Sequence, residues 1–196
     1  MIDRIHLYRP VALAHIEETT KALGFNMASD MLTGSLLRTL AASKSGGMFL
    51  ELGTGTGMGT AWILDGMDTA SRLITMDHDE RVVSVARQAL GSDPRVTFHV
   101  MEGMAFIQSL TVQGIRFDFI FADTFPGKYN ALDETLALLK LGGLYVIDDM
   151  LPQPNWPDGH AVKVTGLIET LEGRPDLRLT KLNWSTGLIV AAKAKK

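Results

Sequence analysis

Four glycines at alternate positions directly follow a short apolar run in the first third of the chain. The apolar run spans residues 48–52, and the glycines are Gly53, Gly55, Gly57 and Gly59. Glycine adopts positive φ angles without strain and lets the backbone approach a ligand closely. Where such a turn leads from a buried strand into a helix, the helix N-terminus points at polar groups of the ligand. The turn predicts a strand–turn–helix unit with a ligand site, although a tight connection without a ligand would need similar glycines.

Strand-like and helix-like patterns alternate after this turn. Apolar or alternating runs predict strands at residues 48–52, 73–76, 96–100, 117–122, 144–147, 177–182 and 188–192. Only residues 183–187 separate the last two runs, which predicts an antiparallel hairpin. We therefore expect an α/β protein with a doubly wound, Rossmann-like, mostly parallel seven-stranded sheet, an antiparallel C-terminal hairpin strand and helices on both faces.

Leucines at helical spacing predict the helix before the fifth strand. Leu132, Leu136 and Leu139 mark its apolar face, and Gly142 and Gly143 are its stop signal. The strand at 144–147 would then begin directly after these glycines.

The first 45 residues differ from the rest of the chain because they contain only helical patterns. Apolar residues recur at helical spacing in two stretches, and either Ser29 or Asp30 can cap the second helix. We expect a single domain over residues 1–196, with residues 1–45 as a helical N-terminal cover and residues 46–196 as the ligand-binding α/β core.

The composition narrows the range of partners. The formal net charge is −3, so bulk electrostatics does not favour DNA or another nucleic acid. There is no cysteine, which excludes disulfides and thiolate metal sites. No apolar run reaches the roughly 18 residues that span a bilayer, and the N-terminus lacks the apolar core of a signal peptide. We expect a cytoplasmic protein that does not act at a membrane.

The spacing of the glycines separates two kinds of nucleotide site. The dinucleotide fingerprint Gly-x-Gly-x-x-Gly would need a third glycine at Met58 or Thr60, so it does not fit. Residues 49–57, Phe-Leu-Glu-Leu-Gly-Thr-Gly-Thr-Gly, instead resemble the first motif of class I S-adenosylmethionine (SAM) methyltransferases. With residues 59–62 added, the motif is similar to that of the small catechol and caffeoyl-CoA-type O-methyltransferases. This resemblance extends over residues 28–193.

The resemblance implies a set of cofactor contacts at the ends of the first four strands. These are Glu51, Gly53, Thr54, Gly55, Thr56, Gly57, Asp77, His78, Gly103, Met104, Ala105 and Asp123. Asp77 would accept the ribose hydroxyls, although an acid there could also cap the next helix. Met104 stands where similar enzymes often carry an acid, and it would either pack on the adenine or fill the core.

Three aspartates follow two strands that should be neighbours in the sheet. Asp123, Asp148 and Asp149 would converge there, and like charges together raise at least one pKa unless a cation is present. Mg²⁺ prefers such oxygen ligands. The resemblance places aspartate at the first two positions and asparagine at the third, so it implies a metal site. Alternatively, Asp123 only orients the methionine end of the cofactor, and the other two cap a turn.

The position of the general base is where the sequence departs from the resemblance. Similar metal-dependent enzymes carry a lysine where Pro126 stands, and proline cannot take a proton. We consider Lys128, which a Pro-Gly turn could redirect, and His160 as catalytic candidates beside Asp123, although either could be a surface residue. Trp156 is expected either to form a wall for a planar acceptor or to seal the core.

These observations predict a SAM-dependent O-methyltransferase that acts on a hydroxyl of a small, catechol-like acceptor with Mg²⁺ or another divalent cation. By the resemblance, such enzymes are often homodimers. The alternatives are a metal-independent methyltransferase, a methyltransferase of hydroxylated RNA bases, and a non-catalytic module that binds SAM or a nucleotide. The acceptor itself cannot be read from the sequence, because loops set its specificity.

Overall fold

The computed structural model describes residue 3 and residues 7–195, so residues 1–2, 4–6 and 196, including the start of the expected helical cover, lie outside the described part. The strands are β1 (Met48–Leu52), β2 (Arg72–Asp77), β3 (Val96–Val100), β4 (Phe117–Ala122), β5 (Leu139–Ile147), β6 (Leu177–Leu182) and β7 (Leu188–Lys193). The helices are α1 (Leu13–Leu23), α2 (Met31–Ala42), α3 (Met58–Gly66), α4 (Glu80–Leu90), α5 (Gly103–Val112), α6 (Leu132–Leu138) and α7 (His160–Glu172).

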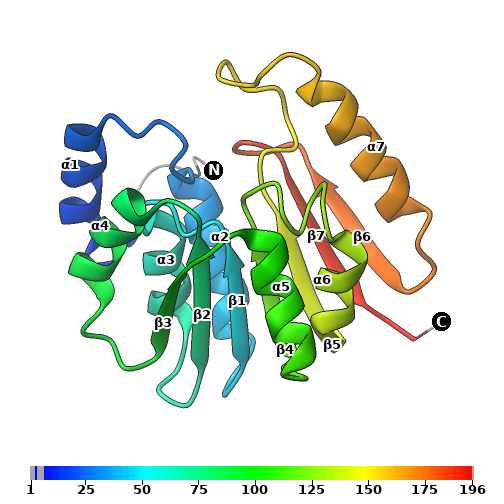
Figure 1. Ribbon diagram of the computed structural model, residues 1–196, viewed down its shortest axis with the longest axis horizontal. Helices are drawn as coiled ribbons and strands as arrows, with labels where there is room; N and C mark the ends of the chain where they lie inside the picture. The colour runs from blue at the N-terminus through cyan, green and yellow to red at the C-terminus, as the bar shows by residue number, and fades with distance from the viewer. Residues whose placement is uncertain (1–2, 4–6, 196) are drawn as a thin grey trace.

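The strands form one sheet in the order β3-β2-β1-β4-β5-β7-β6 (Figure 1). The first five strands are parallel, and β7 lies antiparallel between β5 and β6. This arrangement confirms the predicted fold class, including the hairpin at the C-terminal side. The strand order reverses between β1 and β4, so the carboxyl ends of these two strands are where an open sheet of this kind binds its ligand.

Helices cover both faces of the sheet. Side chains of a strand point alternately to its two faces, and on each face they pack in an apolar cluster with helices. In β1, Leu50 and Leu52 pack in a cluster with α5, α6 and α7. Phe49 points to the other face, where the second cluster contains residues of α1, α2, α3 and α4. The side chain of Asp30 caps α2 by accepting a hydrogen bond from the Leu32 amide at 2.8 Å, which is one of the two predicted caps.

The boundary between α6 and β5 differs from the prediction. The helix ends at Leu138, and the strand already begins at Leu139. Leu139 is buried and pairs with Phe117, whereas Leu144 pairs with Phe119, so extra residues of β5 lie opposite a short stretch of β4. Gly142, at φ 76°, lies within this irregularity and does not stop the helix. Burial of Leu139 against the sheet outweighs the helical spacing of the leucines.

Among the described helices, none is both long enough and apolar enough to cross a membrane.

Candidate active site

The glycine turn is held by a backbone carbonyl and a side-chain carboxylate at the end of β2. The amides of Gly53 and Thr54 both donate to the Met76 carbonyl at 2.9 Å, and the Gly55 amide donates to Asp77 Oδ2 at 2.9 Å. Gly53 has a φ of 102°, and a Cβ atom there would lie 2.8 Å from the Asp123 carbonyl oxygen. The turn therefore requires glycine both for its backbone angles and for its close approach to β4.

Glu51 lies beneath this turn and is completely buried. Its Oε2 accepts hydrogen bonds from Thr60 and Thr75, and Thr75 also contacts the Thr54 hydroxyl at 2.6 Å. Burial raises the pKa of Glu51 to about 7. Because the carboxyl group contacts these threonines and lines neither cavity described below, the arrangement places Glu51 as a support of the turn rather than as a cofactor contact.

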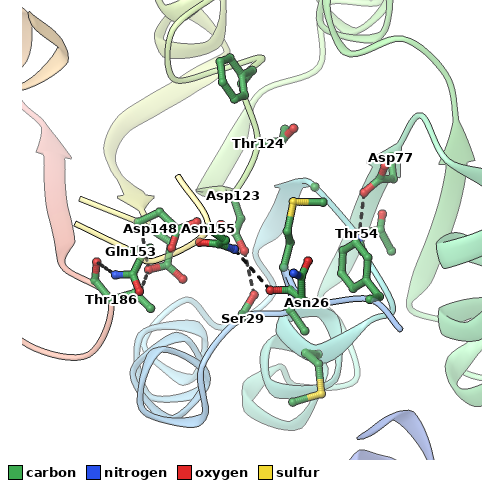
Figure 2. A pocket seen from close by; sticks show the side chains of 18 of the residues that line it. Asn26, Ser29, Thr54, Asp77, Asp123, Thr124, Asp148, Gln153, Asn155 and Thr186 are labelled. Carbon is green, nitrogen blue, oxygen red and sulfur yellow. Dashed lines mark hydrogen bonds between the residues drawn. The ribbon is translucent and has the colours of Figure 1, made fainter. Parts of the chain in front are cut away.

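Two adjoining cavities open at this edge of the sheet. The first has a volume of about 350 Å³ and extends from the glycine turn to the loop after β5. Figure 2 shows Thr54 and Asp77 at one end, Asp148 and Thr186 at the other, and Asp123 between them. The second cavity, of about 370 Å³, shares Asp77 with the first.

Most of the site residues expected from the sequence line these cavities. The first cavity is lined by Gly53, Thr54, Gly55, Thr56, Asp77, His78, Asp123, Lys128, Asp148, Asp149 and His160. Gly103 lines the second cavity, where Pro126 packs against it.

Four expected cofactor residues, Glu51, Gly57, Met104 and Ala105, line neither cavity. Gly57 packs against Ala86 of α4, where a Cβ atom would lie 2.8 Å from the Ala86 Cβ. Met104 and Ala105 point outward from the first turn of α5, and Met104 is 57% exposed. Met104 therefore does not fill the core, and its packing on the adenine stays a prediction.

Lys128 reaches the aspartates, although it lies two positions after Pro126, where the lysine was expected. The chain turns at Gly127, which has a φ of 91° and donates its amide to the Asn130 carbonyl at 2.7 Å. This turn buries the Lys128 side chain to 4% exposure. Its Nζ atom donates to the Asp148 carbonyl at 2.9 Å and lies 3.7 Å from Asp123 Oδ1.

The carboxyl groups around Lys128 are strongly perturbed. Burial raises the pKa of Asp123 well above its usual value, and the nearby Asp148 raises it further, while Lys128 opposes this shift. Burial likewise raises the pKa of Asp148 to about 6, with a further contribution from Asp149. The site holds more negative charge than one lysine neutralises, which is typical of a functional site.

The arrangement of the side chains does not fit the expected magnesium site. In the part of the chain that the structure describes, no three acidic or histidine side chains are grouped as ligands of one metal ion. Asp148 Oδ1 accepts hydrogen bonds from Thr186 and from the Asp149 amide. Asp123 Oδ2 accepts from Ser29 at 2.8 Å, and its Oδ1 faces the Lys128 ammonium. The acids thus face separate protein donors, and the cation among them is a lysine.

Several contacts of the site lack a signal in the sequence. Ser29 holds Asp123 from a loop 94 residues away, and Thr186 holds Asp148 from the turn between β6 and β7. Asn155 donates to the Asn26 carbonyl at 3.4 Å and joins the loop after β5 to the loop before α2 (Figure 2). Serine, threonine and asparagine are common in loops, so their types alone do not mark them.

The comparisons with known proteins agree with this site. Residues 50–150 match the family described as methyltransferase domain, which is just over half of the chain, and the protein belongs to this family. A Mycobacterium bovis protein named as an O-methyltransferase is 30% identical over 141 residues, or 70% of this chain and 62% of that protein. A similarly named Mycobacterium ulcerans protein is 31% identical over 58% of this chain and 52% of its own length. The chain thus spans between about half and three-fifths of these relatives.

Solved structures share the fold at low identity. An O-methyltransferase from Bacillus cereus, in complex with SAH, has a TM-score of 0.85 at 19% identity and covers 96% of this chain and 93% of its own. The O-methyltransferase TomG from Streptomyces achromogenes, in complex with SAM, has a TM-score of 0.84 at 23% identity, with coverage of 97% and 93%. The resemblance inferred from the glycine turn is therefore confirmed for the family and the fold.

Proposed function

We propose that this protein is a SAM-dependent O-methyltransferase that methylates a hydroxyl group of a small molecule. The observation that carries the proposal is the buried Lys128 ammonium between Asp123 and Asp148, at the far end of the cavity that begins at the glycine turn. Relatives named as O-methyltransferases, and a SAM complex of the same fold, support it.

The two cavities suit the two parts of the cofactor. Asp77 lines both, and its carboxylate is the natural acceptor for the ribose hydroxyls. The second cavity, between Asp77 and Gly103, would take the adenine. The glycine turn and Asp123 would hold the methionine end, where Asp123 can accept from its amino group. When bound, SAM supplies an electrophilic methyl group, and the protein must hold the acceptor oxygen in line with it.

Lys128 acts on the acceptor oxygen as a hydrogen-bond donor in this proposal. Its Nζ atom already donates to the Asp148 carbonyl, and an ammonium group offers hydrogen-bond donors but no lone pair for a proton. It would therefore stabilise the negative charge that develops on the oxygen. The proton would pass to a carboxylate of the same cavity, and Asp148, with its pKa raised to about 6, is suited to that role near neutral pH.

No step of this mechanism uses a metal ion, since the arrangement does not fit one. The aromatic side chains at the acceptor end of the cavity suit a planar hydroxylated acceptor, of which the catechol-like class expected from the sequence is one example. A planar compound with one hydroxyl group would suffice for a site based on lysine, whereas chelation of a metal ion would require two neighbouring oxygens on the acceptor.

The experiment measures transfer of a labelled methyl group from SAM to catechols, to phenols with a single hydroxyl group, and to hydroxylated nucleosides. Lys128→Met should lower kcat about 100-fold or more, because one charge-stabilising donor is lost. Lys128→Arg, which keeps the charge, should retain more activity, and Lys21→Met, at an exposed position of α1 outside both cavities, controls for the loss of a lysine. SAH affinity measured by calorimetry should change little in all three variants.

Two results would contradict parts of the proposal. SAH binding without methyl transfer to any acceptor would favour a non-catalytic module. Activity that disappears with a chelator, and returns with Mg²⁺, would contradict the metal-free mechanism and restore the magnesium site.

A further inference from the structure

Four aromatic rings form one continuous wall at the acceptor end of the first cavity. This aromatic wall consists of Phe125, Tyr129, Trp156 and His160, all of which line the cavity. Phe125 and Tyr129 come from the loop after β4, Trp156 comes from the loop after β5, and His160 is the first residue of α7, to which that loop leads (Figure 1). Residues separated by about 30 positions in the chain thus share one surface.

His160 is the ring that joins the two halves of the wall. Its ring centroid lies 4.6 Å from that of Trp156, 5.3 Å from that of Tyr129 and 5.6 Å from that of Phe125. Its Nε2 atom lies 3.2 Å from the Tyr129 hydroxyl, which fixes the ring orientation. Ring pairs at such distances favour tilted or edge-to-face contacts like those seen here.

The two ring nitrogens of His160 are turned toward the protein. Nε2 is paired with Tyr129, and Nδ1 is buried with no hydrogen-bond partner among the described residues. A general base must be within hydrogen-bond reach of the proton that it removes. Neither nitrogen meets that requirement here, so the geometry does not support the catalytic role considered for His160.

The charges that face His160 favour its neutral form. Burial lowers its pKa, and Lys128 and Lys163 lower it further, while Asp149 acts in the opposite direction. The Lys163 ammonium lies 4.8 Å from the Phe125 ring, so it approaches the wall from α7. A protonated imidazole would add a third cation here and would be poorly solvated against Trp156.

We propose that His160 is a specificity-determining residue of the acceptor site, which in its neutral form joins the aromatic wall into a binding surface for a flat ring. This inference rests on the proposed function, since it assigns one part of the same cavity. In the proposed function the cofactor binds at the glycine turn, Asp77 and the second cavity; Phe125 lines both cavities, whereas His160 lines only the first. Changes at His160 should therefore affect acceptor binding and leave cofactor binding intact.

The test titrates 2,3-dihydroxynaphthalene into the SAH-saturated protein and follows binding by calorimetry. His160→Ala should weaken its affinity about tenfold or more, whereas Tyr129→Phe, which frees the imidazole but keeps the rings, should weaken it less. His160→Gln serves as a second variant that preserves a polar group. Val162→Ala, at an exposed position of α7, is the matched control and should bind like the parent.

Measuring the probe affinity at several pH values tests whether the charge state of His160 matters, or only its volume. Between about pH 8 and 5 the probe hydroxyls stay protonated, and the parent should lose affinity as His160 gains a proton. His160→Gln should show a smaller loss, because Asp148, whose pKa is raised to about 6, still gains a proton in this range in both proteins. In turnover with the same compound, His160→Ala should raise KM for the acceptor more than it lowers kcat, with KM for SAM unchanged.

The results separate the inference from the proposed function. Absence of SAH binding in the parent would overturn the proposed function itself. SAH binding without probe binding, or equal probe affinity and equal pH dependence in the parent and in His160→Ala, would overturn only the role of His160.

Discussion

At the scale of single residues, Glu51 shows how a buried acid can support a glycine turn from below. Its two threonine partners come from β2 and α3, so the carboxyl group ties the turn to both elements. A Cβ atom at Gly59 would lie 2.7 Å from Oε1, which explains the fourth glycine of the series. A side chain at position 59 would therefore clash with Glu51 Oε1, a buried oxygen that has no hydrogen-bond partner among the described residues.

Glu51 should make the stability of the protein depend on pH. Its pKa is about 7 in the folded chain and 4.5 for an unperturbed glutamate, so between these values the folded protein retains a proton that the unfolded chain has lost. Raising the pH through this window should lower the free energy of unfolding, by about 3 kcal/mol in total. Urea unfolding of the parent and of Glu51→Gln at several pH values measures this.

Glutamine has no proton to lose, so the variant should show a flatter dependence. The other buried acids, Asp123 and Asp148, contribute in the same direction to both proteins and cancel in the difference. Parallel curves for the two proteins would contradict an elevated pKa at Glu51.

The sequence predicted which acidic and basic residues lie near the site, but it did not predict which contacts their side chains make. The aspartates after β4 and β5 could be placed at one edge because parallel strands end there. Lys128 lies near these aspartates because the backbone turns at Gly127. The Pro-Gly sequence indicates that a turn can form there, but not in which direction it points the lysine. The exposed Met104 could not be separated from a buried one, since methionine suits both environments.

At the scale of elements, the packing of α2 on α3 depends on a single small residue. Gly34 lies directly against the indole of Trp62, and a Cβ atom there would overlap with it. Trp62 is itself almost completely buried at 1% exposure, so it cannot move aside.

Two glycine-to-alanine changes in helices should therefore have opposite effects. Gly34→Ala should destabilise the protein by about 1–3 kcal/mol, because it overpacks this contact. Gly166→Ala, in α7 with open space around it, should stabilise by about 0.5–1 kcal/mol through helix propensity. Chemical denaturation measures both. A neutral effect at Gly34 would mean that α2 and α3 can separate.

The elements themselves were largely predictable, because alternation and helical spacing report burial of one face. The exception at Leu139 has a physical reason. An apolar residue between a helix and a strand satisfies either pattern, and its burial against Phe117 decides the outcome only after the sheet has formed.

At the scale of the whole molecule, ligand binding should be visible as added stability. A ligand that binds only the folded state at 100 times its Kd adds about 2.7 kcal/mol. SAH should therefore raise the melting temperature of the parent. Asp77→Asn should reduce the gain by about 1.4 kcal/mol for each tenfold loss of affinity.

The exposed Asp158 provides the control for this measurement, because Asp158→Asn removes the same charge from a loop. The control should keep the full gain from SAH. If Asp77→Asn kept it as well, the ribose contact assigned to Asp77 would be wrong.

The complete site could not have been predicted, since it is assembled from segments that meet only in the folded chain. Ser29 and Asp123 are 94 positions apart, and Thr186 and Asp148 are 38 positions apart. Each contact depends on the shape of two loops at once, whereas local patterns describe one segment at a time.

The position of β7 between β5 and β6 has a consequence for how the protein is made. A ribosome completes the cofactor turn early, but β7, and Thr186 just before it, are synthesised late. Until β7 has left the exit tunnel and inserted between its neighbours, Asp148 lacks its partner and the sheet keeps an unfilled gap. A nascent chain can thus form the cleft at its glycine turn well before the surroundings of Asp148 are complete.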